Sequence, residues 1–203
     1  MARAGTDRGA PEAVAEVLRA RYAEPHRRYH GVAHLNAVLD HIDELVEAGD
    51  DADTLRLAAW FHDAVYDPER ADNEEISAQL AEGLLPAFKI APDVVAEVAR
   101  LVRLTATHEP AADDRHGAVL CDADLAVLAS GPAAYTDYAV GVRLEYAFLD
   151  DQTFARGRRD MLRRLSERPA LFSTRKGRRL WEADARKNVT TEIRLLDAMI
   201  GAG

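Results

Sequence analysis

Apolar residues recur along the chain at intervals of three and four, which is the period of an amphipathic helix. Stretches that alternate between apolar and polar residues over about six or more positions, as in a half-buried strand, do not occur. We therefore predict an all-α fold, a bundle of about eight or nine helices. The predicted helices cover residues 11–22, 31–48, 53–65, 73–85, 92–107, 116–128, 132–149, 151–167 and 176–200.

The predicted helix 53–65 is entirely apolar over residues 57–61, a pattern typical of a helix buried on most sides, and this run ends in His62 and Asp63. Burying an imidazole and a carboxylate costs free energy unless they are paired or bind an ion. Neighbouring helical residues point about 100° apart, so both reach one cation only if it lies near the helix axis and other helices supply further ligands. His62 and Asp63 are therefore candidate metal ligands.

His30 and His34 stand four residues apart at the start of the predicted helix 31–48, so both imidazoles can face one cavity. Gly31 occupies the position at which the zinc-protease motif H-E-x-x-H carries its glutamate, which excludes that motif. Two surface or capping histidines remain the alternative interpretation.

Asp122 and Asp124 interrupt the apolar run 119–128 of another predicted helix. Residues two apart on a helix point to nearly opposite sides, so we expect only one carboxylate to face the core. The residues alone leave open which one does so, and a pair of solvated acids is the alternative.

The composition narrows the chemistry. A chain of 203 residues fits one domain, which we expect over residues 11–203 after a loose tail at 1–10. Cys121 is the only cysteine, so a metal must be held mainly by nitrogen and oxygen.

A net charge of -9 disfavours binding of a long nucleic acid and leaves a small substrate as the expected partner. No apolar run approaches the roughly 20 residues of a membrane span, and no secretory signal is evident, so we expect a cytoplasmic protein without a membrane partner.

Together these residues form the pattern H…HD…D, made by His34, His62-Asp63 and Asp124. The pattern resembles the HD superfamily of metal-dependent phosphohydrolases, and is most similar to a small bacterial group of predicted HD phosphohydrolases. The segments that carry the resemblance are 22–35, 60–67, 72–78 and 120–125. The resemblance implies a single-domain HD-type helical bundle.

As the resemblance implies, His34, His62, Asp63 and Asp124 are the metal ligands, with Asp122 as the alternative to Asp124. Two imidazoles and two carboxylates suit a divalent ion such as Mn, Fe, Co, Ni or Zn, with Mg as a further candidate. Such an ion activates a water for attack on phosphorus.

A proton donor is implied by a second similarity, to the Tyr-His-Asn-x-x-His segment of cyclic-nucleotide phosphodiesterases. There the first histidine protonates the leaving group, so we expect His30 to act as the general acid. Gly31 departs from that segment, because it stands in place of the asparagine.

Further roles are predicted for residues around this set. We expect Glu75 to orient a ligand histidine or the attacking water, unless it is only part of the acidic first turn of a helix. Arg27, Lys89 and Arg103 are candidate phosphate contacts, with ordinary surface cations as the alternative. His108 is a candidate for the pocket rim, or a surface histidine.

The expected function is hydrolysis of a small phosphate ester by a metal-activated water, with a nucleotide as one candidate substrate. Two alternatives stay open at this point. One is a dinuclear iron oxygenase with the same HD-type fold. The other is a non-catalytic module whose metal is structural or whose pocket senses a nucleotide.

Overall fold

The computed structural model describes residues 9–201, with side chains from Val14 onward, and within this range the chain forms α-helices and 3-10 helices but no strand. The all-α prediction is therefore confirmed. In chain order the elements are α1 (Gly9–Tyr22), α2 (Val32–Leu45), α3 (Ala52–His62), α4 (Asn73–Leu84), η1 (Leu85–Phe88), α5 (Pro92–Leu104), α6 (Arg115–Leu125), η2 (Ala126–Ala129), α7 (Pro132–Glu145), α8 (Asp151–Ser166) and α9 (Arg175–Gly201).

The ends of the helices differ most from the prediction. Most of the predicted tail lies outside the described residues, but Gly9 and Ala10 already belong to α1. Several predicted helices extend past the observed C-terminal ends, because apolar residues continue where the helical backbone does not. Val46 is extended after α2, with φ -61° and ψ 145°. Residues 126–128, predicted as the end of a helix, belong instead to the tighter 3-10 helix η2 (Ala126–Ala129).

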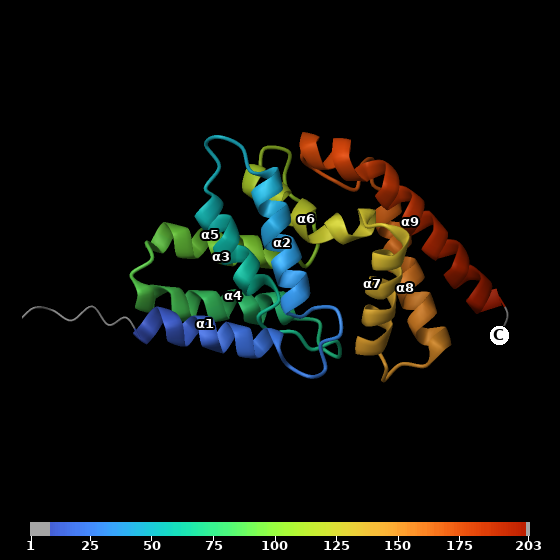
Figure 1. Ribbon diagram of the computed structural model, residues 1–203, viewed down its shortest axis with the longest axis horizontal. Coiled ribbons are helices and arrows are strands. Elements are labelled where there is room, and N and C mark those ends of the chain that lie inside the picture. Colours follow the sequence, from blue (N-terminus) through green and yellow to red (C-terminus); the bar gives the residue numbers. More distant parts are fainter. Residues whose placement is uncertain (1–8, 202–203) are drawn as a thin grey trace, which may run out of the picture.

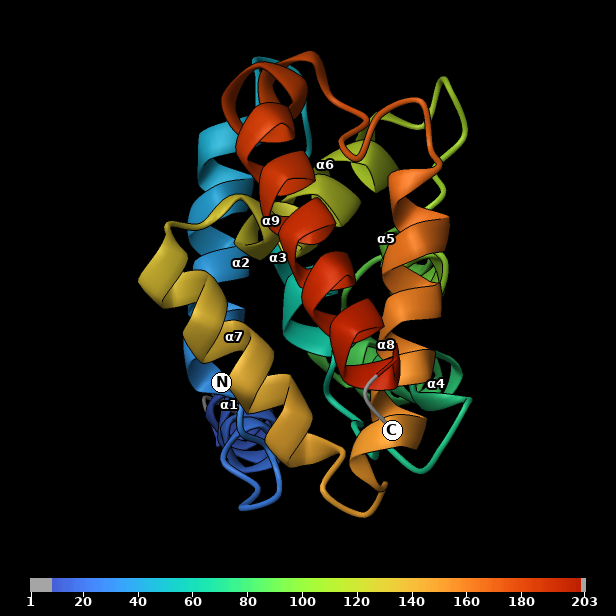
Figure 2. The ribbon, with the colours of Figure 1, turned by 90° about the vertical axis from the view of Figure 1, so that its right-hand side faces the viewer.

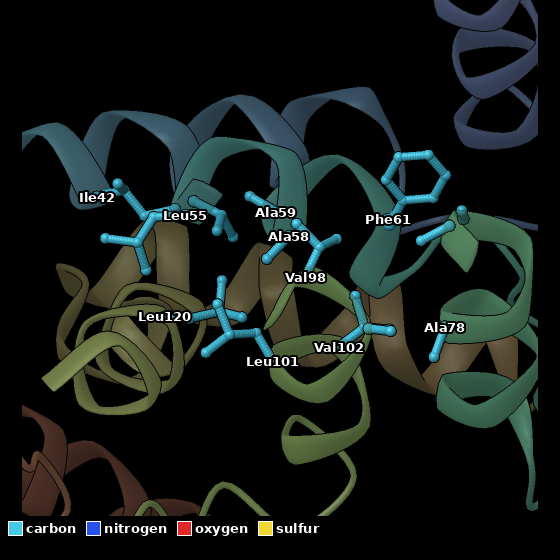
Figure 3. Close-up of a cluster of buried hydrophobic side chains, with 14 of the residues drawn as sticks. Ile42, Leu55, Ala58, Ala59, Phe61, Ala78, Val98, Leu101, Val102 and Leu120 are labelled. Carbon is cyan, nitrogen blue, oxygen red and sulfur yellow. The ribbon is translucent and has the colours of Figure 1, made fainter. Parts of the chain in front are cut away.

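The first half of the chain packs around α3, as its apolar pattern predicted. Leu55, Ala58, Ala59 and Phe61 of this helix are fully buried. Figure 3 shows them among apolar side chains of the surrounding helices, including Ile42, Ala78, Val98, Leu101, Val102 and Leu120. The two alanines allow neighbouring helices to approach closely, and the larger side chains each contribute about 1.5–3 kcal/mol on burial.

The helices α7, α8 and α9 lie beside this first part, and the segment α6–η2 leads from one part to the other (Figure 1). They enclose a second apolar cluster, and Trp181 of α9 packs against both clusters. The buried Arg158 of α8 ties these helices together: it donates to Glu192 at 2.9 Å and to the hydroxyl of Tyr138 at 2.7 Å. The chain therefore has two apolar centres, and α6 and η2 run between them.

In the described range, no individual helix combines the length and the apolar character that crossing a membrane requires. The segments Arg115–Ala129 and Pro132–Glu145 reach both only when taken together, and they meet at a bend of 107°.

Candidate metal centre

Three helix ends meet at one point beside the apolar side chains around α3, and the polar residues at these ends form a cluster. His34 lies in the first turn of α2, His62 is the last residue of α3, and Asp124 is next to the end of α6. Asp63 follows His62 as the C-cap of α3, with φ -112° and ψ 20°. Because the helix ends between these two neighbours, both side chains reach the same point beyond its end.

The ligand-type atoms of these residues lie within a few ångströms of one another. The Nε2 atoms of His34 and His62 are 3.2 Å apart, and Oδ1 of Asp124 lies 3.1 Å from Nε2 of His34. Oδ2 of Asp63 lies 3.2 Å from Nε2 of His62 and 3.5 Å from Nε2 of His34. Nitrogen and oxygen atoms from His34, His62 and Asp124 are all mutually within 4.8 Å, a spacing that fits a single metal ion.

The donor set itself fits a cation. Nδ1 of His62 is 2.7 Å from the carbonyl oxygen of Ala59 and donates a hydrogen bond to it. When the ring is neutral, the other nitrogen, Nε2, therefore carries a lone pair that faces the cluster. Oδ2 of Asp63 is buried and accepts no hydrogen bond from any described residue. A lone pair and an orphaned carboxylate oxygen that point into one buried space are what a divalent ion would satisfy.

Each charged group of the cluster shifts the pKa of its neighbours. Burial disfavours the charged form of His62, but the carboxylates of Asp63 and Asp124 outweigh it and raise the pKa of His62 to about 9. Burial likewise acts against ionised Asp63, but the neighbouring imidazoles lower the pKa of this carboxyl well below its usual value. The pKa of Asp124 is lowered in the same way, against its burial, by hydrogen bonds from His108 and His34.

The structure separates Asp124 from its alternative, Asp122. The carboxylate of Asp122 points toward the start of α9, where it accepts the backbone N–H groups of Ser173 at 2.6 Å and Thr174 at 2.8 Å. A side chain on the neighbouring Gly177 would collide with this carboxylate. Asp122 therefore anchors α9, and Asp124 is the aspartate of this pair that reaches the histidines.

His30 lies in the loop before α2 and lines the cavity beside the cluster, with its ring centroid 5.6 Å from that of His34. Its Nδ1–H donates to Oε2 of Glu145 at 2.7 Å, which directs the other ring nitrogen away from Glu145. The ring also stacks on Tyr66, with the centroids 4.3 Å apart. Burial lowers the pKa of His30, but the hydrogen bond to Glu145 and the nearby carboxylates outweigh it and raise the pKa above its usual value.

Glu145, at the end of α7, is the residue of this site to which the sequence assigned no role. Its Oε1 accepts three consecutive backbone N–H groups, from Arg28, Tyr29 and His30, at 2.8, 2.8 and 2.9 Å. Its Oε2 accepts the hydroxyl of Tyr66 at 2.9 Å as well as His30. The sequence gives no role to this glutamate, because its partners lie between 79 and 117 residues earlier in the chain.

His108 contacts the cluster from the loop after α5. Its Nε2 lies 2.7 Å from Oδ2 of Asp124, the oxygen opposite to the one that faces His34. The backbone of His108 is left-handed, with φ 52°, which is uncommon for a residue with a side chain. Arg168 holds this turn by donating to the carbonyl oxygens of His108 at 2.8 Å and Thr107 at 2.7 Å.

The structure does not bring the remaining predicted residues to the cluster. Glu75 is exposed and bound to Arg103 at 2.6 Å, and neither side chain lines the cavity, because the two ions on neighbouring helices satisfy each other. Lys89 is exposed after η1 and also lies outside the cavity lining. Arg27 is buried next to the site, but its guanidinium donates to the carbonyl oxygens of His30 and Asp63 and so holds backbone rather than a phosphate.

A cavity of about 860 Å³ opens onto the cluster. Its wall includes His30, His62, Asp63, His108 and Asp124, together with residues of α7 and α8. The cluster thus lies where the first part of the fold faces the C-terminal helices, with access to a space large enough for a small molecule.

Comparison with known proteins found no similarity on which to build: no family model matches the chain, and no curated protein or solved structure matches it. The resemblance to the HD superfamily therefore stays a prediction carried by the motif residues. The geometry of the cluster and its cavity stands independently of that resemblance.

Proposed function

We propose that the chain is a metal-dependent phosphohydrolase that acts on a small phosphate ester. The observation that carries the proposal is the convergence of His34, His62, Asp63 and Asp124 around an orphaned carboxylate oxygen at the wall of a cavity. A purely structural metal site is usually closed by its protein ligands. Here the ligand-type groups face a space that a substrate can enter.

Each residue has a defined task in this proposal. His34, His62, Asp63 and Asp124 would hold the ion, and the Ala59 carbonyl fixes the ring of His62 in the orientation that presents Nε2. When bound, a divalent cation supplies Lewis acidity: it lowers the pKa of a coordinated water and neutralises charge on a phosphoryl oxygen. His108 holds the second oxygen of Asp124 and so limits the rotation of that carboxylate.

His30 is the proton donor to the departing oxygen in this scheme. Glu145 accepts the hydrogen bond from Nδ1, and the Tyr66 ring stacks on one face of the imidazole. Both contacts restrict rotation of the His30 ring, so the direction of Nε2 is fixed. An alkoxide is a poor leaving group unless it is protonated as the bond to phosphorus breaks, and a fixed imidazolium beside the site meets that need.

Metal dependence is tested by loading the protein with Mn²⁺ and measuring binding by calorimetry and turnover of phosphate monoesters. His34→Ala and Asp124→Asn are expected to lose both. The matched control is His116→Ala, which removes a histidine that bonds Glu97 and the backbone N–H of Asp51 away from the cavity. Full turnover by the Asp124→Asn variant without bound metal would overturn the proposal.

The role of His30 is tested by its dependence on the leaving group. His30→Ala is expected to slow hydrolysis of an alkyl phosphate by about 100-fold or more, and of 4-nitrophenyl phosphate far less, because nitrophenolate departs without a proton. Equal losses for both esters would show that His30 does not act as a general acid.

One observation favours a second candidate function, a dinuclear iron oxygenase. The two oxygens of Asp124 face different histidines, His34 and His108, so Asp124 and His108 would be the residues to hold a second ion, and two irons would supply oxygen-activating redox chemistry. Metal analysis of protein purified without oxygen separates the two functions: two irons per chain favour the oxygenase, and one ion favours the phosphohydrolase.

A further inference from the structure

The cavity is much larger than the group on which the metal cluster would act. A volume of about 860 Å³ is near the upper end of the range for pockets that enclose a whole small-molecule ligand, and a phosphate group fills only a fraction of it. The rest of the space must suit the part of the substrate that does not react. The side chains that line the cavity therefore indicate the class of substrate.

Apolar side chains gather on one side of the cavity wall, and polar side chains line the rest of it. One face of α8, whose course is visible in Figure 2, presents Phe154, Met161 and Leu165. From the first to the last of these, the face extends about 16 Å along the helix axis. Leucine and valine side chains from other elements line the same cavity: Leu125 of α6, Val127 and Leu128 of η2, Val142 of α7 and Leu149. A hydroxyl group held against these apolar side chains would find no partner among them, whereas an apolar group there would be stabilised by burial.

Gly157 adds room in the middle of this face. It lies inside α8, lines the cavity, and has no heavy atom within 4 Å of the position that a Cβ would occupy. Glycine within a helix costs about 1 kcal/mol relative to alanine, so helix stability does not explain it. Its effect is to keep the cavity open between Phe154 and Met161.

Arg164 supplies a positive charge on the same helix. The other cavity arginines are engaged, since Arg70 pairs with Asp72, Arg158 with Glu192 and Arg168 with Glu109. In the described part of the chain, Arg164 has no hydrogen bond or ion pair. It lies in the last turn of α8, four residues before Arg168, which holds the backbone of His108. Arg164 thus lines the cavity with a guanidinium that is free to bind phosphate oxygens.

We propose that the substrate is a phosphate ester of a bulky, largely apolar alcohol, with Arg164 binding its phosphate and the apolar face of α8 binding its alcohol part. This inference rests on the proposed function as far as hydrolysis of the ester is concerned. Binding of the ester does not depend on the proposed function. It replaces the phosphate contacts that the sequence suggested, Arg27, Lys89 and Arg103, with a residue that lines the cavity.

The first test compares ethyl, butyl and hexyl phosphate with glucose 6-phosphate, in the Mn²⁺-loaded protein. The kcat/KM of the alkyl series is expected to rise by up to about fourfold per added methylene, and glucose 6-phosphate is expected to be a poor substrate. No increase along the alkyl series, or a preference for the sugar phosphate, would overturn the inference.

Gly157→Leu fills the cavity from the helix side without a backbone collision. It is expected to lower the ratio of kcat/KM for hexyl over ethyl phosphate by about tenfold or more. The matched control is Gly83→Leu, the same change in the exposed face of α4, where a Cβ also meets nothing within 4 Å. An unchanged ratio in the Gly157 variant, or an equal fall in the control, would contradict the assignment of this wall.

Binding without turnover separates this inference from the proposed function. Calorimetry with hexyl phosphate is expected to show binding that Arg164→Ala weakens by about tenfold or more, while Arg156→Ala, on an outward-facing part of α8, has little effect. Binding of this kind without hydrolysis would support the substrate class and refute the phosphohydrolase. Metal-dependent hydrolysis of ethyl phosphate with no binding of hexyl phosphate would do the reverse.

Discussion

The replacement Glu145→Gln tests whether one buried carboxylate holds the loop that carries His30. Glutamine has nearly the same shape and keeps one oxygen for the three backbone N–H groups. Its other terminal atom becomes an NH₂ group that faces the Nδ1–H of His30 and the hydroxyl of Tyr66, both of which donate to Glu145. Two buried donors thereby lose their acceptor and meet a third donor.

The magnitude follows from these contacts. A buried donor left without its acceptor costs about 1–3 kcal/mol, so we expect a loss of about 3 kcal/mol or somewhat more in the free energy of unfolding. The titration of Glu145 leads to a similar figure. Burial raises its pKa, but the hydrogen bonds from His30 and the loop outweigh burial and lower the pKa from 4.5 to about 2, which corresponds to about 3 kcal/mol.

The same shift sets the pH dependence. A carboxylate whose pKa is lower in the folded state stabilises the fold above its unfolded pKa, and this contribution is lost as the pH falls from about 4.5 to about 2. The difference in stability between wild type and Glu145→Gln should therefore be largest at neutral pH and shrink across that window. At pH values above about 4.5, the difference in stability between wild type and the variant should stay constant.

The assay is urea denaturation followed by far-UV circular dichroism, at neutral pH and at several acidic values. Thermal unfolding gives a second measurement, with an expected fall of roughly 6–12 °C for a chain of this length. The control is Glu75→Gln, which removes a charge from the exposed pair with Arg103 and should change stability little. A Glu145 variant as stable as wild type at neutral pH would refute the reasoning.

Three further predictions concern the metal cluster and the core. Asp122→Asn should lower the melting temperature while Mn²⁺ binding persists, whereas Asp124→Asn should abolish binding, as calorimetry can show; equal loss of binding would place both at the ion. Adding Mn²⁺ at 100 times its Kd should stabilise the fold by about 2.7 kcal/mol in calorimetric scans, an effect that a chelator reverses and that must be absent if no site forms. Leu55→Ala should cost about 2–5 kcal/mol in urea denaturation, because Leu55 is fully buried beside α5; a cost below 1 kcal/mol would contradict the packing around α3.

The helices and the candidate metal ligands at the end of α3 could be predicted from local sequence. Amphipathic periodicity acts over one or two turns, so the nine segments stand out without knowledge of their partners. The entirely apolar centre of α3 likewise predicted a buried helix, and its end in His62 and Asp63 predicted two polar groups with a reason to be buried. The structure brings both to His34 and Asp124.

Helix ends and the choice between two aspartates needed the tertiary structure. The apolar pattern continues past α2, α3 and α6, because buried residues also occur in extended and 3-10 segments. Asp122 and Asp124 are equivalent in a local view. Only the position of the segment just before α9, where the N–H groups of Ser173 and Thr174 bind Asp122, leaves Asp124 for the cluster.

The surroundings of the site depended on the fold almost entirely. Glu75 and Arg103 are good candidates by residue type, yet they satisfy each other at the surface because α4 and α5 pack side by side. Glu145 contacts His30 only because the end of α7 meets the loop before α2, and Arg164 lines the cavity only because one face of α8 forms part of its wall. Local periodicity is a property of neighbours in the chain, whereas the partner of a charge and the wall of a cavity are set by residues that folding brings together from distant segments.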